Sequence, residues 1–386
     1  MKDITPLTSR PTRDEYDLRM RKVWGKAAAL GLGAYVSTWL ENVYYLSGFV
    51  YTAHERPFFL VLKEGGPTLV VPKLEADHAR EHTWIDDIAE YDEYPAPPGR
   101  GWSDALARAL GGVRRVGIES SLPVYAREAI GRTTVVSDII EDVRLVKSEW
   151  EIGRIAYAAE VCDVGTQAMV ENSAEGVSEL TLYSAGRNAV TMKIVQDIPH
   201  ANFQVTKSVT AVWMGRMSAM PHATPSIFDT MRAGEPNVSL VSLQADGYSA
   251  ECERTYFLGE PDRRARQLFE TMTEARRIAF SMIRPGASCS EIDRAVLGFL
   301  RDKGHSEHIL HRTGHGFGVS VHEAPWIAEG SEHVLEEHML VSVEPGIYIS
   351  GYAGFRHSDT VLVTRDGPVC LTKYPTSLDA LVMTSG

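Results

Sequence analysis

The sequence predicts an α+β protein built as two domains, an N-terminal α/β domain over residues 1–143 and a larger α+β domain over residues 144–386. Three observations favour this organisation. The chain has 386 residues, which is more than a single hydrophobic core usually fills. Short strand-like runs alternate with helical patterns up to about residue 140. Beyond that point, long amphipathic stretches group around strand-like runs.

The first domain begins with a predicted surface helix, because apolar residues recur at helical spacing over 13–30. Two apolar runs, 58–62 and 68–71, flank Lys63-Glu64-Gly65-Gly66-Pro67, a composition typical of a hairpin turn. The remaining predicted elements are two helices and two strands, over 75–81, 102–110, 115–118 and 133–136. Strands that alternate with helices predict a small α/β domain.

The second domain is predicted to begin with a long helix over 148–171, with Ser148 as its N-cap. Ser288, three residues before Glu291, fits a capping box at the start of a helix over 288–303. The other predicted elements are helices over 178–194 and 262–283, and strands over 208–214, 237–243, 340–343 and 360–363.

The composition excludes several classes of partner. Lys and Arg number 39 against 51 Asp and Glu, a formal net charge of −12, so the chain lacks the basic surface that nucleic acids and anionic membranes require. The N-terminus lacks the apolar core of a signal peptide, and no apolar run approaches the ~20 residues of a membrane helix. The four cysteines lack the spacing of a zinc site or a disulfide framework. We therefore expect a cytoplasmic protein with reduced thiols and no nucleic-acid or membrane partner.

Residues capable of chemistry concentrate in the second domain, in four short clusters. The first is His222 in a proline-bracketed loop, where an ordinary surface histidine is the more frequent case. The second places Glu251 and Glu253 two residues apart on a predicted strand, so that both carboxylates point to the same face. Adjacent carboxylates raise at least one pKa unless a cation lies between them. A solvated, charged strand face is the alternative, which the apolar run that follows disfavours.

The other two clusters lie further along the chain. His315 and His322 are seven residues apart in a glycine-rich stretch, and histidine suits proton transfer or metal ligation near neutral pH. Glu344 ends an apolar run just before a Pro-Gly turn, where an unpaired buried carboxylate would be costly. Each cluster alone is consistent with a structural loop, but four of them in one domain predict an enzymatic site.

These motifs and their order resemble the pita-bread superfamily, which includes Xaa-Pro aminopeptidase, prolidase, methionine aminopeptidase and creatinase. The resemblance covers nearly the whole chain. Outside the four clusters it rests on Asn42-Val43-Tyr44-Tyr45-Leu46-Ser47-Gly48-Phe49, Val116-Gly117-Ile118-Glu119 and Arg144-Leu145-Val146-Lys147-Ser148. It implies an N-terminal α/β creatinase-type domain, a C-terminal pita-bread domain and a homodimer.

The resemblance also tests for a metal site, because peptidases of this superfamily hold two divalent ions with two Asp, one His and two Glu. Leu240 stands where the first Asp is expected, eleven residues before Glu251, and Ser358 stands where the last Glu is expected. Glu251, His315 and Glu344 fill the other three positions. Hard divalent ions want several charged oxygens, so a two-ion site is not expected. A single ion on Glu251, His315 and Glu344 stays open.

With two ligands absent, the chain resembles creatinase, the superfamily member that works without a metal. The Glu-Arg-Thr motif of creatinase is present as Glu253-Arg254-Thr255, its catalytic histidine falls on His222, and its second cation-holding glutamate falls on Glu344. The resemblance makes His222 a general acid and base, and it makes Glu253 and Glu344 the partners of a substrate cation.

The resemblance assigns the remaining site residues as well. His315 and His322 would position water or stabilise the tetrahedral intermediate. Trp326 takes the place of a carboxylate-binding arginine of creatinase, and an aromatic ring there would stack on a flat or apolar group. The predicted substrate-binding residues are Arg56, Trp326, Tyr248 and Phe49.

The resulting prediction is a metal-independent, creatinase-like hydrolase with no cofactor. It would cleave a non-peptide C–N bond in a small guanidino, amidino or related amino-acid-derived substrate, linear or cyclic. Two alternatives stay open. One is a metal-dependent Xaa-Pro aminopeptidase or dipeptidase with a reduced metal site, and the other is a non-catalytic pita-bread binding protein.

Overall fold

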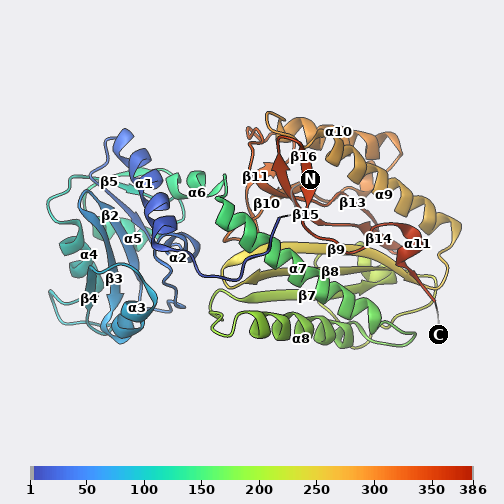
Figure 1. The fold of residues 1–386 in the computed structure, drawn as a ribbon, viewed down its shortest axis with the longest axis horizontal. Helices are drawn as coiled ribbons and strands as arrows, with labels where there is room; N and C mark the ends of the chain where they lie inside the picture. The colour runs from blue at the N-terminus through green and yellow to red at the C-terminus, as the bar shows by residue number, and fades with distance from the viewer. Residues whose placement is uncertain (1–3, 385–386) are drawn as a thin grey trace. The chain divides into compact units, whose positions relative to one another are not determined.

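The computed structural model describes residues 4–384, which divide into two compact units, shown as ribbons in Figure 1. One unit spans 10–144, and the other combines residues 4–9 with 145–384. Residues 4–9 were expected in the first domain. They belong to the second unit because the Leu7 amide donates to the Gly153 carbonyl at 2.9 Å and the Leu7 side chain packs against Gly153.

The N-terminal unit is built on a six-stranded mixed sheet in the order β4-β3-β2-β1-β5-β6. The strands are β1 (Ala34–Ser37), β2 (Phe59–Lys63), β3 (Gly66–Pro72), β4 (Ile88–Tyr91), β5 (Arg115–Ile118) and β6 (Thr133–Val136). β2 pairs antiparallel with both β1 and β3, while the other neighbours are parallel. The predicted hairpin and the two predicted strands of this domain are confirmed. Gly65 and Gly66 adopt the positive φ of 99° and 119° that a tight turn between β2 and β3 requires.

Six α-helices accompany this sheet. They are α1 (Arg13–Ala29), α2 (Leu40–Ser47), α3 (Ala76–His82), α4 (Trp102–Leu110), α5 (Val124–Ile130) and α6 (Ile139–Arg144). The predicted surface helix is α1, which begins where the Thr12 hydroxyl accepts the Glu15 amide. The hydrophobic core lies between the helices and the sheet and includes Val36, Val61 and Leu106.

The C-terminal unit has two sheets. The first has the order β17-β9-β8-β7, formed by β7 (Lys207–Met214), β8 (Pro236–Ala245), β9 (Tyr248–Leu258) and β17 (Val382–Met383). In this sheet β7, β8 and β9 pair antiparallel, while β17 runs parallel to β9. The second has the order β11-β10-β12-β15-β16, formed by β10 (Gly314–Gly316), β11 (Glu323–Ile327), β12 (Leu340–Val343), β15 (Asp359–Thr364) and β16 (Gly367–Cys370). A hairpin of β13 (Gly346–Ile349) and β14 (Ala353–Arg356) lies in sequence between β12 and β15.

Helices cover both sheets, as predicted for an α+β domain. α7 (Glu149–Glu171) and α8 (Glu179–Asp197) pack on β7–β9, whereas α9 (Arg263–Met282) and α10 (Cys289–Asp302) pack on the second sheet and the hairpin (Figure 1). A short helix, α11 (Leu378–Leu381), precedes β17. Ser148 and Glu151 form a reciprocal capping box at the start of α7, and the Ser288 hydroxyl accepts the Glu291 amide at the start of α10. Within residues 4–384, no helix is both long and apolar enough to cross a membrane.

Strand register brings the polar clusters of the sequence together. Across the β8–β9 pair, Leu240 lies opposite Glu253 and Ser242 opposite Glu251. Backbone hydrogen bonds in both directions between Glu253 and Ser358 join β9 to the segment before β15. Glu251 and Glu253 on β9 therefore lie beside the segment that joins β14 to β15.

Candidate active site

A cavity of about 720 Å³ opens in the C-terminal unit where these strands end. Its wall is unusually rich in groups that titrate or carry charge. The ionisable residues that line it are His222, His311, Arg312, His315, His322, Glu344 and Arg356. The loop after η2 (Gly215–Ala219), the segment from 310 to 322, and the ends of β12 and β14 supply these residues.

Three carboxylates converge behind this wall. Glu251 and Glu253 project from the same face of β9, as predicted, and Glu344 follows directly after β12. Each offers an oxygen within 4.8 Å of the others, and Glu251 and Glu253 are buried. Burial, reinforced by Glu344, raises the pKa of Glu251. Buried carboxylates this close together need a proton or a cation among them.

One of the three carboxylates already has its cation. The guanidinium of Arg356, at the end of β14, forms a buried ion pair with Glu253 and donates to the Tyr348 hydroxyl at 2.9 Å. Burial raises the pKa of Glu253 against the opposing effect of Arg356, while the surrounding acidic groups keep Arg356 charged. Gly354 allows β14, which carries Arg356, to lie against η2. A Cβ atom at this position would overlap the carbonyl oxygen of Ser218 in η2.

His315 connects the other two carboxylates. Its Nδ1 lies 3.1 Å from the Gly316 carbonyl oxygen, which fixes the ring proton on that nitrogen when the ring is neutral. Its buried Nε2 then presents a lone pair to Glu344 Oε1 at 3.2 Å, with no hydrogen bond of good geometry. Although burial acts to lower it, the pKa of His315 is raised by Glu344. Although burial acts to raise it, the pKa of Glu344 is held below its ordinary value by His315. Two lone-pair donors that face each other at this distance require a proton or a metal ion between them.

The residues present do not fit the two ions that the resemblance implies. Leu240 is buried in an apolar cluster with Ala211, Trp213 and Val238, and it offers no ligand atom. The Ser358 hydroxyl donates to Glu251 Oε1 at 2.8 Å, where a second carboxylate was expected. Glu253 is neutralised by Arg356, so Glu251, Glu344 and His315 would carry a net charge of about −2 once a metal ion has taken the place of the proton between His315 and Glu344. That charge and donor set fit one divalent ion.

The cavity wall carries three further histidines. His222 is exposed in the loop after η2, and His322 precedes β11, with its ring centroid 4.1 Å from that of His315. Burial, assisted by the charge of His315, lowers the pKa of His322 to about 4, so its ring is neutral at pH 7. His311 Nε2 lies 2.7 Å from the Tyr348 hydroxyl, and burial lowers the pKa of His311. The structure thus brings His222, His315 and His322 to one cavity.

None of the four predicted substrate-binding residues is among those that line this cavity. Tyr248 is buried and its hydroxyl donates to Glu151 Oε1 at 3.1 Å, so it supports α7 instead of lining the cavity. Phe49 is fully buried in the core of the N-terminal unit, in an aromatic cluster with Phe58. Arg56, in the same unit, is paired with Glu55 and Glu93, each at 2.6 Å. The roles predicted for Phe49 and Arg56 stay predictions, because both residues lie in the unit that does not hold this cavity.

Trp326 lies on β11, and its ring faces the guanidinium of Arg312, whose carbon is 4.7 Å from the ring centroid. No role was predicted from the sequence for Arg312, His311 or Arg356. The first two directly precede the glycine-rich histidine cluster, and Arg356 lies in the motif that ends in Ser358. Their positions beside these motifs are the sequence signal that could have indicated all three as site residues.

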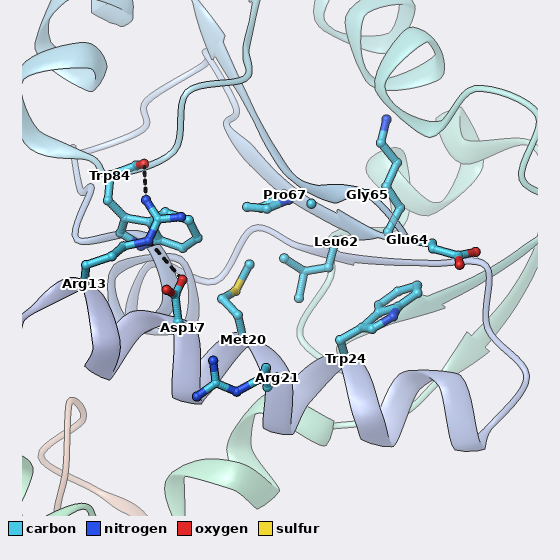
Figure 2. Close-up of a pocket in the computed structure, with 12 residues that line it drawn as sticks. Arg13, Asp17, Met20, Arg21, Trp24, Leu62, Glu64, Gly65, Pro67 and Trp84 are labelled. Carbon is cyan, nitrogen blue, oxygen red and sulfur yellow. Dashed lines mark hydrogen bonds and ion pairs between the residues drawn. The ribbon is translucent and has the colours of Figure 1, made fainter.

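A second cavity, of about 360 Å³, lies in the N-terminal unit between α1 and the β2–β3 hairpin (Figure 2). Arg13 ion-pairs with Asp17 at 2.9 Å and lies 4.0 Å over the ring of Trp84. Met20 and Trp24 face Leu62 across it (Figure 2). None of the twelve residues that line this cavity is a histidine, cysteine or serine. It lacks the histidines that gather in the cavity of about 720 Å³, which is therefore the candidate active site.

Glu179, the first residue of α8, holds the loop that carries His222. Its two carboxylate oxygens accept the backbone amides of Met214 at 2.9 Å and Ser226 at 3.0 Å, and its own amide donates to Asp229 O at 3.1 Å. These bonds fix the loop to both the end of β7 and the start of α8. Glu179 is fully buried, and this burial raises its pKa to about 7.

This arrangement predicts a specific pH dependence of stability. The folded-state pKa of Glu179 lies above its ordinary value of 4.5, so folding takes up a proton between pH 4.5 and about 7. The stability that protonated Glu179 contributes is full below pH 4.5 and is lost as pH rises to about 7. Glu179→Gln should flatten this slope, at a constant cost of about 1 kcal/mol for one lost hydrogen bond. Urea unfolding of both proteins between pH 5 and 8 checks this, and identical pH slopes would contradict it.

Comparisons with known proteins identify the family. The model described as "Metallopeptidase family M24" matches residues 153–365, and that described as "Creatinase/Prolidase N-terminal domain" matches residues 19–146. The chain is 32% identical to the Xaa-Pro dipeptidase of Pyrococcus horikoshii, over 86% of this chain and 90% of that protein. Among solved structures, it is similar to the prolidase from the same organism (TM-score 0.83, 28% identity, covering 94% of this chain and 99% of that one). It is also similar to dipeptidase PepE from Mycobacterium ulcerans (TM-score 0.84, 27% identity, covering 98% and 100%).

These comparisons confirm the pita-bread resemblance and the two-domain fold class. They contradict the metal-independent, creatinase-like function predicted from the sequence, because the similar proteins are named as Xaa-Pro dipeptidases and prolidases and the matching family is one of metallopeptidases. The prediction gave decisive weight to the missing ligands Leu240 and Ser358. It gave too little weight to the three ligand positions that remain, Glu251, His315 and Glu344.

Proposed function

Because this chain belongs to metallopeptidase family M24, we propose that it is a metal-dependent hydrolase of Xaa-Pro dipeptides that works with a single divalent ion. The observation that carries the proposal is the convergence of Glu251, Glu344 and His315 on the cavity, with the third carboxylate, Glu253, neutralised by Arg356. This leaves two free negative charges and one imidazole lone pair for one dication.

Glu251, Glu344 and His315 would hold the ion, and His322 lies close enough to Glu251 and His315 to be a further ligand. The chemistry supplied by a bound divalent ion is Lewis-acid polarisation of a carbonyl and acidification of water. The remaining work belongs to the side chains of the wall. His222, which lies on the same cavity and is not among the proposed ligands, would take a proton from water and return it to the leaving nitrogen.

The homodimer implied by the family resemblance is part of this proposal, and light scattering that returns twice the chain mass tests it. A dipeptide is small enough for a cavity of about 720 Å³. The wall offers charged groups of both signs, as recognition of a zwitterionic dipeptide requires.

Metal analysis combined with a peptidase assay tests the proposed function. Purified protein is expected to bind about one Mn, Co or Zn ion per chain and to hydrolyse Ala-Pro, with little activity on Ala-Ala. A chelator should reduce the rate at least ~100-fold, because no side chain of the cavity replaces the Lewis acid. Added Mn²⁺ should restore the rate. Hydrolysis of Ala-Pro that persists unchanged in metal-free protein would contradict the proposal.

A further inference from the structure

Arg312 differs from every other charged group in the C-terminal cavity. The wall carries two arginines, and Arg356 is committed to Glu253. Arg312 has no carboxylate partner among residues 4–384, and its one hydrogen bond there runs from Nε to the Gly314 carbonyl oxygen at 3.1 Å. The wall therefore holds a permanent positive charge without a carboxylate partner, in a cavity that Glu344 also lines.

The surroundings of Arg312 fix the orientation of its guanidinium. One face lies over the Trp326 ring, 4.7 Å from the centroid, and the bond to Gly314 restrains Nε. Stacking on an indole leaves the in-plane N–H groups of a guanidinium free, because the ring contacts only its face. The free edge, formed by the two terminal nitrogens, matches the spacing of a carboxylate and allows a bidentate contact.

The distribution of charge in the cavity predicts which end of a dipeptide would contact Arg312. Glu251, Glu253 and Glu344 form the acidic base, whose charge is balanced by Arg356 and by the proposed divalent ion, so it offers no free positive charge to a substrate carboxylate. Arg312 is the wall residue that would attract one. A zwitterionic dipeptide would therefore bind with its carboxylate on Arg312 and its remaining polar groups towards the acidic base.

We propose that Arg312, supported by the ring of Trp326, binds the free carboxylate of the substrate and restricts this site to substrates that end in a carboxylate. The proposal rests on the dipeptidase function for the identity of the substrate, whereas the preference for an acid over an amide follows from Arg312 itself. Trp326 acts through Arg312 and is a positioning residue.

Binding of a matched pair of probes tests the proposal without turnover. The probes are the reduced-bond analogue of Ala-Pro, with CH₂ in place of the scissile carbonyl, and the same compound as its C-terminal amide. By calorimetry, the wild type should bind the acid about 10–100-fold more tightly than the amide, the range expected for a charge-assisted bidentate contact. Arg312→Gln should lose this preference and bind both probes alike. Equal binding of the two probes by the wild type would overturn the proposal.

Kinetics separates this role from a structural one. In Arg312→Gln, KM for Ala-Pro should rise about 10–100-fold while kcat changes less than about threefold, since the contact is the same in substrate and transition state. Arg312→Lys should recover part of the loss, because it keeps the charge without the fork. Metal content and the thermal midpoint should match the wild type. A fall in kcat with an unchanged KM would overturn the proposal. If the wild type fails to hydrolyse Ala-Pro but still prefers the acid probe through Arg312, the dipeptidase function fails and the carboxylate site stands.

Discussion

Replacing Leu240 with aspartate and Ser358 with glutamate in one variant should raise the bound metal from one divalent ion per chain to two. Both positions adjoin the acidic base of the cavity. Leu240 lies opposite Glu253 in the β8–β9 pair, and the Ser358 hydroxyl contacts Glu251 at 2.8 Å. Two added carboxylates would supply the oxygens that a second hard cation lacks at present. Elemental analysis of the purified variant, expressed per chain, measures the outcome.

The double variant should be less stable than the wild type when no metal is bound, and bound metal should restore part of that stability. Leu240 is 8% exposed and packs against Ala211 and Trp213, so an aspartate there places an uncompensated charge in an apolar cluster. We expect the metal-free double variant to lose about 3–5 kcal/mol of stability. Mn²⁺ at 100 times its dissociation constant should return about 2.7 kcal/mol for each ion bound. Thermal unfolding with chelator and with Mn²⁺ checks both figures.

A matched control distinguishes the effect of the added charges from the effect of the changed side-chain shapes. The variant with Leu240→Asn and Ser358→Gln has side chains of the same size without the added charge. It should be destabilised, hold no more than one ion and gain from Mn²⁺ no more stability than one bound ion supplies. If the Asp–Glu variant also holds a single ion, the absence of two carboxylates does not account for the reduced site.

The fold was predictable from local sequence signals because those signals act over a few residues. Ser148 and Ser288 each mark a helix start by accepting an amide three residues further on, and the structure confirms both helices. The pair Gly65-Gly66 marks the β2–β3 turn by the positive φ that glycine tolerates. β10, β11 and β14 are short and irregular, and the pattern alone did not indicate them.

The site was only partly predictable because its charge balance depends on distant partners. Arg356 meets Glu253 across 103 positions of the chain, and this pairing decides that one of three carboxylates is unavailable to a metal. From sequence, Glu253 was predicted to hold a cationic substrate and Tyr248 to bind the substrate. The Tyr248 hydroxyl is instead bonded to Glu151, 97 positions away. Residue types locate the site, but only the fold shows which charges are already neutralised.

Glu344→Gln should remove the metal and the activity together. Glu344 is half-buried, its Oε1 faces His315 Nε2 at 3.2 Å and also accepts the Ser342 hydroxyl at 3.1 Å. Conversion to an amide keeps the shape but removes one of the two free charges that balance a dication. We expect metal content to fall below about one tenth of an ion per chain and the rate on Ala-Pro to fall at least ~100-fold, since even outer-shell changes cost 10–100-fold. Elemental analysis and the peptidase assay measure both.

Glu253→Gln is the control for the prediction about Glu344→Gln. It removes a carboxylate from the same cluster, but one whose charge is already neutralised by Arg356. It should lower stability by about 3–5 kcal/mol, because Arg356 is left buried without its partner, and yet retain close to one ion per chain. If Glu253→Gln loses the metal as completely as Glu344→Gln, the ion is held by all three carboxylates. The balance of two charges against one dication would then be wrong, and Arg356 would have to leave Glu253 when the metal binds.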